Sequence, residues 1–307
     1  MNTAKLKHRH HSPMARAEAR VAYLCLIPAF LGLSLITYIP LMSVFGLGLF
    51  NWKATSTPYW VGMGNYIKLF TTDPYFLDSI RVTVVFSLMA VIGSMLYSLS
   101  VAMLLNRKIP ARSMFRAIFY LPYILPAAGV YVGWSWLFEP NFGLFNYVLN
   151  SIGIKRVMFL NDSKTVLQSL AVVSVWLSGN LIVIFLAGLQ SVPRVYHEAA
   201  EIDGANAWQR LLNVTLPCMS PIIFYNLLMS LIANMQIIVP ALSLTNGGPG
   251  KSSMFMSFLI YRTAFQNSQL GYASAISFAL FVVIGIFTAI LFATSKSWIF
   301  HEGGDGK

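Results

Sequence analysis

The sequence predicts an all-α integral membrane protein with six transmembrane helices and both termini in the cytoplasm. Of its 307 residues, 57% are hydrophobic and only 10% are charged, too few charges to cover the surface of a water-soluble protein of this size. Long apolar runs alternate with short polar connections along the whole chain. The lysines and arginines gather in alternate connections. Together these observations indicate a polytopic membrane protein with a defined orientation.

Six apolar segments are long enough to cross a bilayer, because a hydrocarbon core about 30 Å thick needs roughly 20 residues in a helix. None alternates between apolar and polar residues as a strand would, and a helix satisfies its own backbone in lipid. The segments are residues 21–49, 79–105, 115–138, 166–190, 219–244 and 271–294. They define a six-span domain over residues 21–295, between a basic tail at 1–20 and a C-terminal tail at 296–307. Prolines within or beside several runs predict kinked helices.

The distribution of positive charge predicts the orientation. Thirteen lysines and arginines lie in the two tails and in the connections after the second and fourth spans, against eight in the other connections. Because cytoplasmic loops carry the excess of Lys and Arg, both termini are expected in the cytoplasm. The connection at residues 191–217 is then cytoplasmic too.

Several other functions are excluded or disfavoured by the residues. No basic stripe with interleaved aromatic residues indicates nucleic-acid binding. The histidine cluster at residues 8–11 lies in a basic tail, where solvated or lipid-facing charge is the simpler interpretation, and Cys25 and Cys218 suggest neither a metal site nor a disulfide. The segment 247–252 looks like a phosphate-binding loop but follows Thr245, where such a loop needs glycine. No metal or cofactor is therefore expected in this chain.

The hydrophilic connection has a definite local pattern. Glu198 and Glu201 lie near the start of a short helix expected after Pro193, where the helix dipole favours negative charge. Gly204 permits a turn that a residue with a Cβ would resist. Residues 205–216 are expected to form a second helix, and Pro217 marks the return to the membrane.

This pattern resembles the coupling loop of permease subunits of bacterial ATP-binding-cassette importers, specifically carbohydrate permeases of the maltose and sn-glycerol-3-phosphate type. The matching order is Glu-Ala-Ala, three residues, Gly, nine residues, an aliphatic residue, one residue and Leu-Pro. Residues 61–66, 120–122, 187–190 and 244–250 extend the resemblance over most of the chain. It assigns ATPase coupling to these residues: Glu198, Ala199, Ala200, Asp203, Gly204, Leu216 and Pro217.

The resemblance implies a type I importer permease fold in the bacterial cytoplasmic (inner) membrane, and no catalysis by this chain. It also implies a second homologous permease subunit, two ATPase subunits that bind ATP and Mg, an extracytoplasmic substrate-binding protein and membrane lipid as partners. The expected cargo is a sugar or oligosaccharide. A glycerol phosphoester or another small polar solute is the alternative cargo. An ion-coupled secondary carrier is the alternative class of transporter. Charged residues such as Arg81, Arg116 and Glu139 lie only at the margins of the spans, whereas ion-coupled carriers commonly place them inside.

Uncharged polar and aromatic side chains inside the spans are candidates for the substrate path. Asn226, Ser230 and Asn234 follow one another at four-residue spacing and share a helix face. The same argument, applied to the third, fourth and fifth spans, adds Tyr131, Trp134, Trp176, Asn180 and Gln236. Amides can hydrogen-bond sugar hydroxyls, and aromatic rings can lie flat against sugar faces. Polar residues also hold helices together in membranes, and that interpretation stays open for each of them.

Overall fold

The computed structural model describes residues 13–299, with side chains from residue 17, and this part of the chain is mostly helical. The histidine cluster, most of the predicted N-terminal tail and residues 300–307 lie outside the described residues. Helix α1 (Pro13–Leu33) begins inside the predicted tail and continues through the π-helical turn η1 (Ser34–Tyr38) into α2 (Ile39–Leu47). The π-turn precedes Pro40, whose nitrogen cannot donate a helical hydrogen bond.

Three helical stretches of the described chain are long and apolar enough to cross a membrane, and three bent pairs of helices bring the possible total to six. The long ones are Ala17–Leu47, α4 (Phe76–Asn106) and α15 (Leu270–Ser295). One bent pair is α5 (Arg112–Ile124) with α6 (Ala127–Leu137), at 98°. A second is α8 (Val166–Trp176) with α9 (Gly179–Ser191), at 50°. The six-span interpretation therefore holds only if each pair makes one span.

The third bent pair shifts the predicted fifth span. Helix α13 (Ser220–Met235) ends nine residues before the predicted boundary at residue 244 and meets the segment Ala207–Cys218 at 68°. Residues after Met235 leave the helix, and Pro240 begins the π-helical turn η3 (Ala241–Thr245). Hydropathy stays high across this turn, so composition alone places the end of the helix too late.

Helix α4 is the centre of the bundle and packs against α8, α9 and α13. A line of small polar residues along it is almost completely buried. Small side chains let neighbouring helix backbones approach closely, and their hydroxyls can bond across helices in lipid. The members are Ser79, Thr83, Ser87, Ser94 and Ser98.

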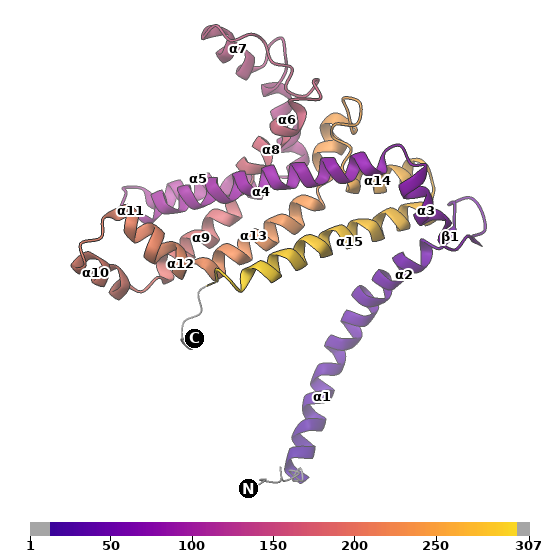
Figure 1. Cartoon of the computed structure of the whole chain (residues 1–307), viewed down its shortest axis with the longest axis horizontal. Helices are drawn as coiled ribbons and strands as arrows, with labels where there is room; N and C mark the ends of the chain where they lie inside the picture. The colour runs from indigo at the N-terminus through magenta and orange to yellow at the C-terminus, as the bar shows by residue number, and fades with distance from the viewer. Residues whose placement is uncertain (1–12, 300–307) are drawn as a thin grey trace.

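Helices α1 and α2 diverge from the rest of the molecule (Figure 1). None of the most apolar stretch of this first span is buried, although side chains such as Phe30 and Leu24 are large and apolar. Only the α2 end returns to the bundle, where it packs against α15. The outer surface of α1 is therefore available to lipid or to another subunit.

The two ends of the bundle differ. One end carries a small hairpin of β1 (Phe50–Asn51) and β2 (Tyr59–Trp60). Three short helical elements lie at the same end: α3 (Gly64–Thr71), α14 (Met256–Tyr261) and the π-turn η4 (Arg262–Gln266). They cover a core that includes Phe76, Phe86 and Phe255. Helix α7 (Leu144–Ser151) projects to one side (Figure 1). At the opposite end, α10 (Arg194–Ile202) and α11 (Ala207–Arg210) lie near the end of α15 (Figure 1).

Candidate substrate cavity and coupling segment

A cavity of about 480 Å³ lies where three of the helices are interrupted. It is bounded by the break between α5 and α6 at Leu125, by the break between α8 and α9 at Leu177 and Ser178, and by the end of α13. Irregular backbone inside a membrane protein is tolerated where it is buried in protein or faces a water-filled space. The cavity therefore explains why three helices can be interrupted inside the membrane-spanning bundle.

Local sequence accounts for two of these breaks. Leu125 precedes Pro126 and has the extended backbone that a residue before proline prefers (φ −66°, ψ 145°), which ends α5. Gly179 begins α9 where a Cβ would come within 2.6 Å of the Phe119 carbonyl oxygen. A glycine is required at this position because α9 and the backbone of α5 touch there.

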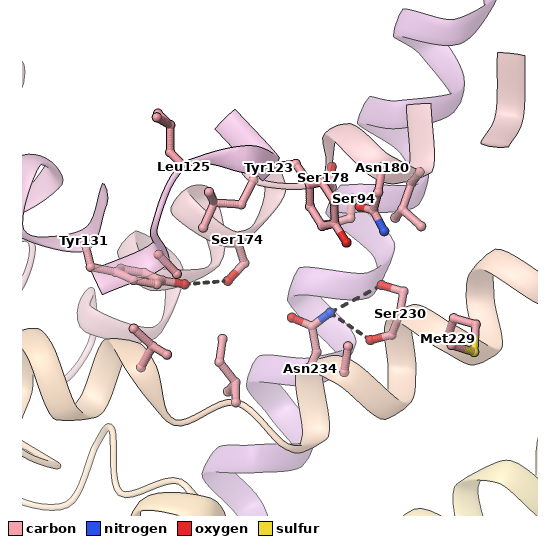
Figure 2. A pocket seen from close by; sticks show the side chains of 16 residues that line it. Ser94, Tyr123, Leu125, Tyr131, Ser174, Ser178, Asn180, Met229, Ser230 and Asn234 are labelled. Carbon is pink, nitrogen blue, oxygen red and sulfur yellow. Dashed lines mark hydrogen bonds between the residues drawn. The ribbon is translucent and has the colours of Figure 1, made fainter. Parts of the chain in front are cut away.

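The polar groups of the cavity form two clusters (Figure 2). On one side the Tyr131 hydroxyl lies 3.2 Å from the Ser174 hydroxyl. On the other, the Asn234 amide donates to the Ser230 carbonyl at 2.8 Å and lies 3.3 Å from its hydroxyl. The Asn180 side chain, whose amide makes no hydrogen bond to another described residue, is turned toward this second cluster. Its hydrogen-bonding capacity is free for a ligand.

The structure brings four of the eight predicted path residues to this cavity: Tyr131, Asn180, Ser230 and Asn234. Trp134 and Trp176 line a neighbouring apolar groove of about 640 Å³, with their rings 5.6 Å apart. Asn226 is completely buried, and neither its amide nitrogen nor its oxygen has a hydrogen-bond partner among the described residues. Gln236 is exposed and does not line the cavity.

Ser94 also lines the cavity and was not among the predicted path residues. The neighbouring Ser98 hydroxyl lies 2.9 Å from that of Ser178, so the serine line of α4 both packs and contributes to the cavity wall. The repeated four-residue spacing of these serines is a signal for a buried face. Spacing alone gives no sign that one of them reaches the cavity.

The predicted coupling segment, residues 191–217, is a separate exposed unit at the other end of α9. Helix α10 follows Pro193 as expected, but its first turn holds no acidic residue: Glu198 lies in its middle and Glu201 next to its last residue, so the predicted position of both near the start of the helix is wrong. Gly204 adopts φ +81°, a left-handed conformation that ends the helix and favours glycine. Glu198, Ala199 and Asp203 are exposed, Ala200 is partly covered, and Leu216 and Pro217 are half-buried at the base of the segment. The predicted turn at Gly204 is therefore present.

The second helix begins two residues later than predicted, at Ala207. The Asn206 side chain accepts from the Gln209 backbone while the Gln209 side chain accepts from the Asn206 backbone, a reciprocal capping box. Arg210 pairs with Glu201 and ties this helix to α10. Large apolar side chains remain exposed on the segment: Val195 is 68%, Ile202 86% and Trp208 66% exposed. Such apolar surface in a hydrophilic segment is typical of a protein interface.

Comparison with known proteins identifies the family. Residues 91–298 match the family described as binding-protein-dependent transport system inner membrane component. The chain belongs to this family. It is thus a non-catalytic permease subunit of an ATP-binding-cassette importer and a multi-pass protein of the cytoplasmic membrane.

Curated relatives resemble the permease over nearly its whole length. It is 34% identical over 291 residues to a probable ABC transporter permease protein, YesP, of Bacillus subtilis (strain 168), covering 94% of each chain. It is 33% identical to the multiple sugar-binding transport system permease protein MsmF of Streptococcus mutans, covering 85% of this chain and 90% of the relative. The trehalose/maltose transport system permease protein MalF of Thermococcus litoralis is 29% identical over 94% of this chain and 95% of its own.

Solved structures confirm the fold. The permease superposes on a chain of a bacterial alginate ABC transporter, in complex with a periplasmic protein bound to an alginate pentasaccharide, with a TM-score of 0.76. The match covers 91% of this chain and 95% of the other, at 21% identity. The fold class predicted from the sequence, a type I importer permease, is thereby confirmed.

Proposed function

We propose that the permease passes a sugar or oligosaccharide through the cavity between α4, α6, α9 and α13. The observation that carries this proposal is the chemistry of the cavity wall. It offers two amides, several hydroxyls and the rings of Tyr123 and Tyr131, and no lysine, arginine, aspartate or glutamate among the described residues that line it. Hydroxyl-rich neutral cargo is matched by such donors and acceptors. The sugar-related names of its relatives support the same cargo class.

The lack of charge in the cavity wall also disfavours the two alternatives, a glycerol phosphoester cargo and an ion-coupled carrier. A glycerol phosphoester would favour a cation in the path, because phosphate oxygens prefer charged donors. An ion-coupled carrier would favour an ionisable side chain there. Neither kind of group lines the cavity within the described part of the chain.

Energy would come from two separate ATPase subunits that bind ATP and Mg. Their docking site is α10 together with Trp208, where exposed apolar side chains lie beside Glu198 and Asp203. Docking of the ATPase subunits at α10 would put α10 and both termini in the cytoplasm, the orientation that the charge distribution along the chain predicts. Closure of the ATPase pair would move α10 and expose the cavity alternately to the two sides of the membrane.

A second, homologous permease subunit and an extracytoplasmic binding protein would complete the importer. The unburied face of α1 supports a partner subunit, because a helix that contacts so little of its own chain is free to pack on another. The binding protein would deliver sugar at the opposite end of the bundle, over the β1–β2 hairpin and α14.

Substitution in the cavity tests the transport role in the assembled complex. Asn180→Leu and Asn234→Leu remove amides from the wall, and we expect uptake of the sugar to fall at least tenfold while basal ATP hydrolysis continues. Asn226→Leu is the matched control, since this asparagine is buried in the same helix as Asn234 but does not line the cavity. Uptake that survived in both cavity variants would contradict the proposed path.

Two glycines with almost the same backbone conformation test the coupling role. Gly204→Ala and Gly153→Ala impose comparable strain, because φ is +81° and +80° and no atom would crowd the added Cβ at either site. Only the first should uncouple ATP hydrolysis from uptake. Glu198→Lys should weaken ATPase binding through reversed charge. Equal behaviour of the two glycine variants, or intact coupling in Glu198→Lys, would refute docking at α10.

A further inference from the structure

Three arginines gather where α4 ends and α5 begins, at the same end of the bundle as α10. Arg107 caps α4, Arg112 opens α5, and Arg116 follows one turn later on the same face of that helix. Within residues 17–299, the ion pairs are Arg210 with Glu201 and Lys251 with Asp78. The three guanidinium groups of this cluster therefore have no carboxylate partner among the described side chains.

Neutral groups hold the cluster together. The Gln190 side-chain amide, at the end of α9, faces both Arg112 and Arg116; with the amide oriented to satisfy these donors, its oxygen accepts from Arg112 at 3.0 Å and from Arg116 at 3.1 Å. The Asn106 oxygen lies 3.4 Å from the same Arg112 nitrogen atom. The Nε atoms of both arginines are buried without a hydrogen-bond partner in the described structure. Two like charges thus converge on one amide oxygen, an arrangement that a nearby anion would stabilise.

A cavity of about 450 Å³ adjoins this cluster. Asn106 and Arg107 line it, together with Leu189, the neighbour of Gln190 in α9. His197 of α10 and Arg210 also line it. The cavity has space for a polar headgroup. Arg107 is part of its wall, and Arg112 contacts the lining residue Asn106.

The rest of α5 offers an apolar surface beside the charged one. Apart from Tyr123, which lines the substrate cavity, five large side chains on this helix are between 38% and 62% exposed: Met114, Phe115, Ile118, Leu121 and Ile124. In a protein of the cytoplasmic membrane such a surface is suited to contact with acyl chains. A ligand that fits both parts carries a phosphate at one end and hydrocarbon at the other.

We propose that Arg107, Arg112 and Arg116 bind the phosphate of an anionic phospholipid, with its headgroup in the adjacent cavity and its acyl chains along α5. Basic pockets between transmembrane helices recognise anionic headgroups in this way. Since Gln190 belongs to the helix that leads into the coupling segment and His197 belongs to α10, the bound lipid would join α5 to the moving part of the importer.

Native mass spectrometry of the assembled importer in detergent tests this site. The probes are phosphatidylglycerol and phosphatidylcholine, added separately at equal concentration. We expect the wild type to retain phosphatidylglycerol preferentially, and Arg112→Gln/Arg116→Gln to lose that preference by roughly thirtyfold, the scale expected for two arginine contacts. The matched control is Lys155→Gln/Arg156→Gln, which removes two exposed charges at another place and should keep the preference.

Two further outcomes would overturn the assignment. A wild-type complex that showed no preference between the two lipids would leave no anionic-lipid site, whatever the variants do. Displacement of phosphatidylglycerol by excess inorganic phosphate, with no requirement for acyl chains, would instead indicate a site for a soluble anion. Because both measurements use the wild-type complex, they stay informative even if the double variant assembles poorly, and neither depends on which sugar is carried.

Discussion

The first span and α4 look alike in sequence and differ sharply in their surroundings. Each covers 31 residues, and the most apolar 18-residue stretch of each has a mean hydropathy of 2.1. Within the structure, none of the most apolar stretch of Ala17–Leu47 is buried, whereas 39% of the corresponding stretch of α4 is. Hydropathy therefore identifies a helix that can enter lipid but says nothing about whether lipid or protein surrounds it.

The difference follows from the small polar residues. In α4 the serine and threonine line lets α8, α9 and α13 approach closely, and Ser98 bonds to Ser178 across the interface. The first span presents large apolar side chains instead, and its Ser43 bonds only to its own helix, at the Ile39 carbonyl. Small polar residues at four-residue spacing thus mark packing against protein.

The strongest test of this contrast is a matched pair of serine-to-leucine substitutions. Ser98→Leu would place a bulky side chain in a fully buried position and remove the bond to Ser178, and overpacking alone costs about 1–3 kcal/mol. Ser43→Leu changes an exposed position of the first span and should have little effect. Thermal unfolding of the purified complex measures both. Equal stability of the two variants would contradict the difference in packing.

A double substitution asks what covers the first span. Leu24→Ala/Leu31→Ala removes two exposed side chains from α1, seven residues apart and so on one face. If a second permease packs there, its copurification with this chain should weaken by about tenfold, or about 1.4 kcal/mol. The stability of this chain itself should not change. Undiminished copurification would indicate that lipid covers this face of α1.

Glycine-to-alanine substitutions should give the smallest effects, of opposite sign in the two spans. A Cβ at Gly93 of α4 would lie 2.7 Å from a Val175 methyl group, so this side chain must shift. A Cβ at Gly32 of α1 would meet nothing within 4 Å, and alanine favours a helix over glycine by about 1 kcal/mol. Gly93→Ala should lower the melting temperature, and Gly32→Ala should leave it unchanged or raise it. A loss of stability in Gly32→Ala would reveal a covering neighbour.

Much of the fold could be predicted because the length of each apolar segment can be counted directly from the sequence. The positions of the spans and the turn at Gly204 follow from composition and from one residue type. The break at Leu125 agrees with the kink predicted from Pro126, whereas the breaks at Leu177 and at the end of α13 could not be located, because hydropathy continues unchanged through them. The prediction for the start of α11 was wrong because the capping box of Asn206 and Gln209 determines where this helix begins. The spacing of apolar residues, on which the prediction was based, contains no information about such a pair.

The candidate site was predictable in part for the same reason. Four-residue spacing correctly groups Ser230 with Asn234, which share a helix. It also includes Asn226, two turns away, because spacing gives a face of a helix and not the depth at which a cavity opens. Trp134 and Trp176, also predicted to line the path, lie beside each other in the neighbouring apolar groove instead of the cavity, a contact that spacing did not predict.

Helix α9 connects the cavity to the coupling segment as one uninterrupted helix. Its 13 residues run without interruption from the cavity wall at Asn180 almost to α10, a length of about 20 Å at 1.5 Å per residue. A tilt of about 10° at one end displaces the other by about 3 Å over this length, comparable to a hydrogen-bond distance. In the proposed mechanism, a small rotation of the coupling segment would therefore be sufficient to make or break contacts between Asn180 and the cargo, without any helix having to unfold.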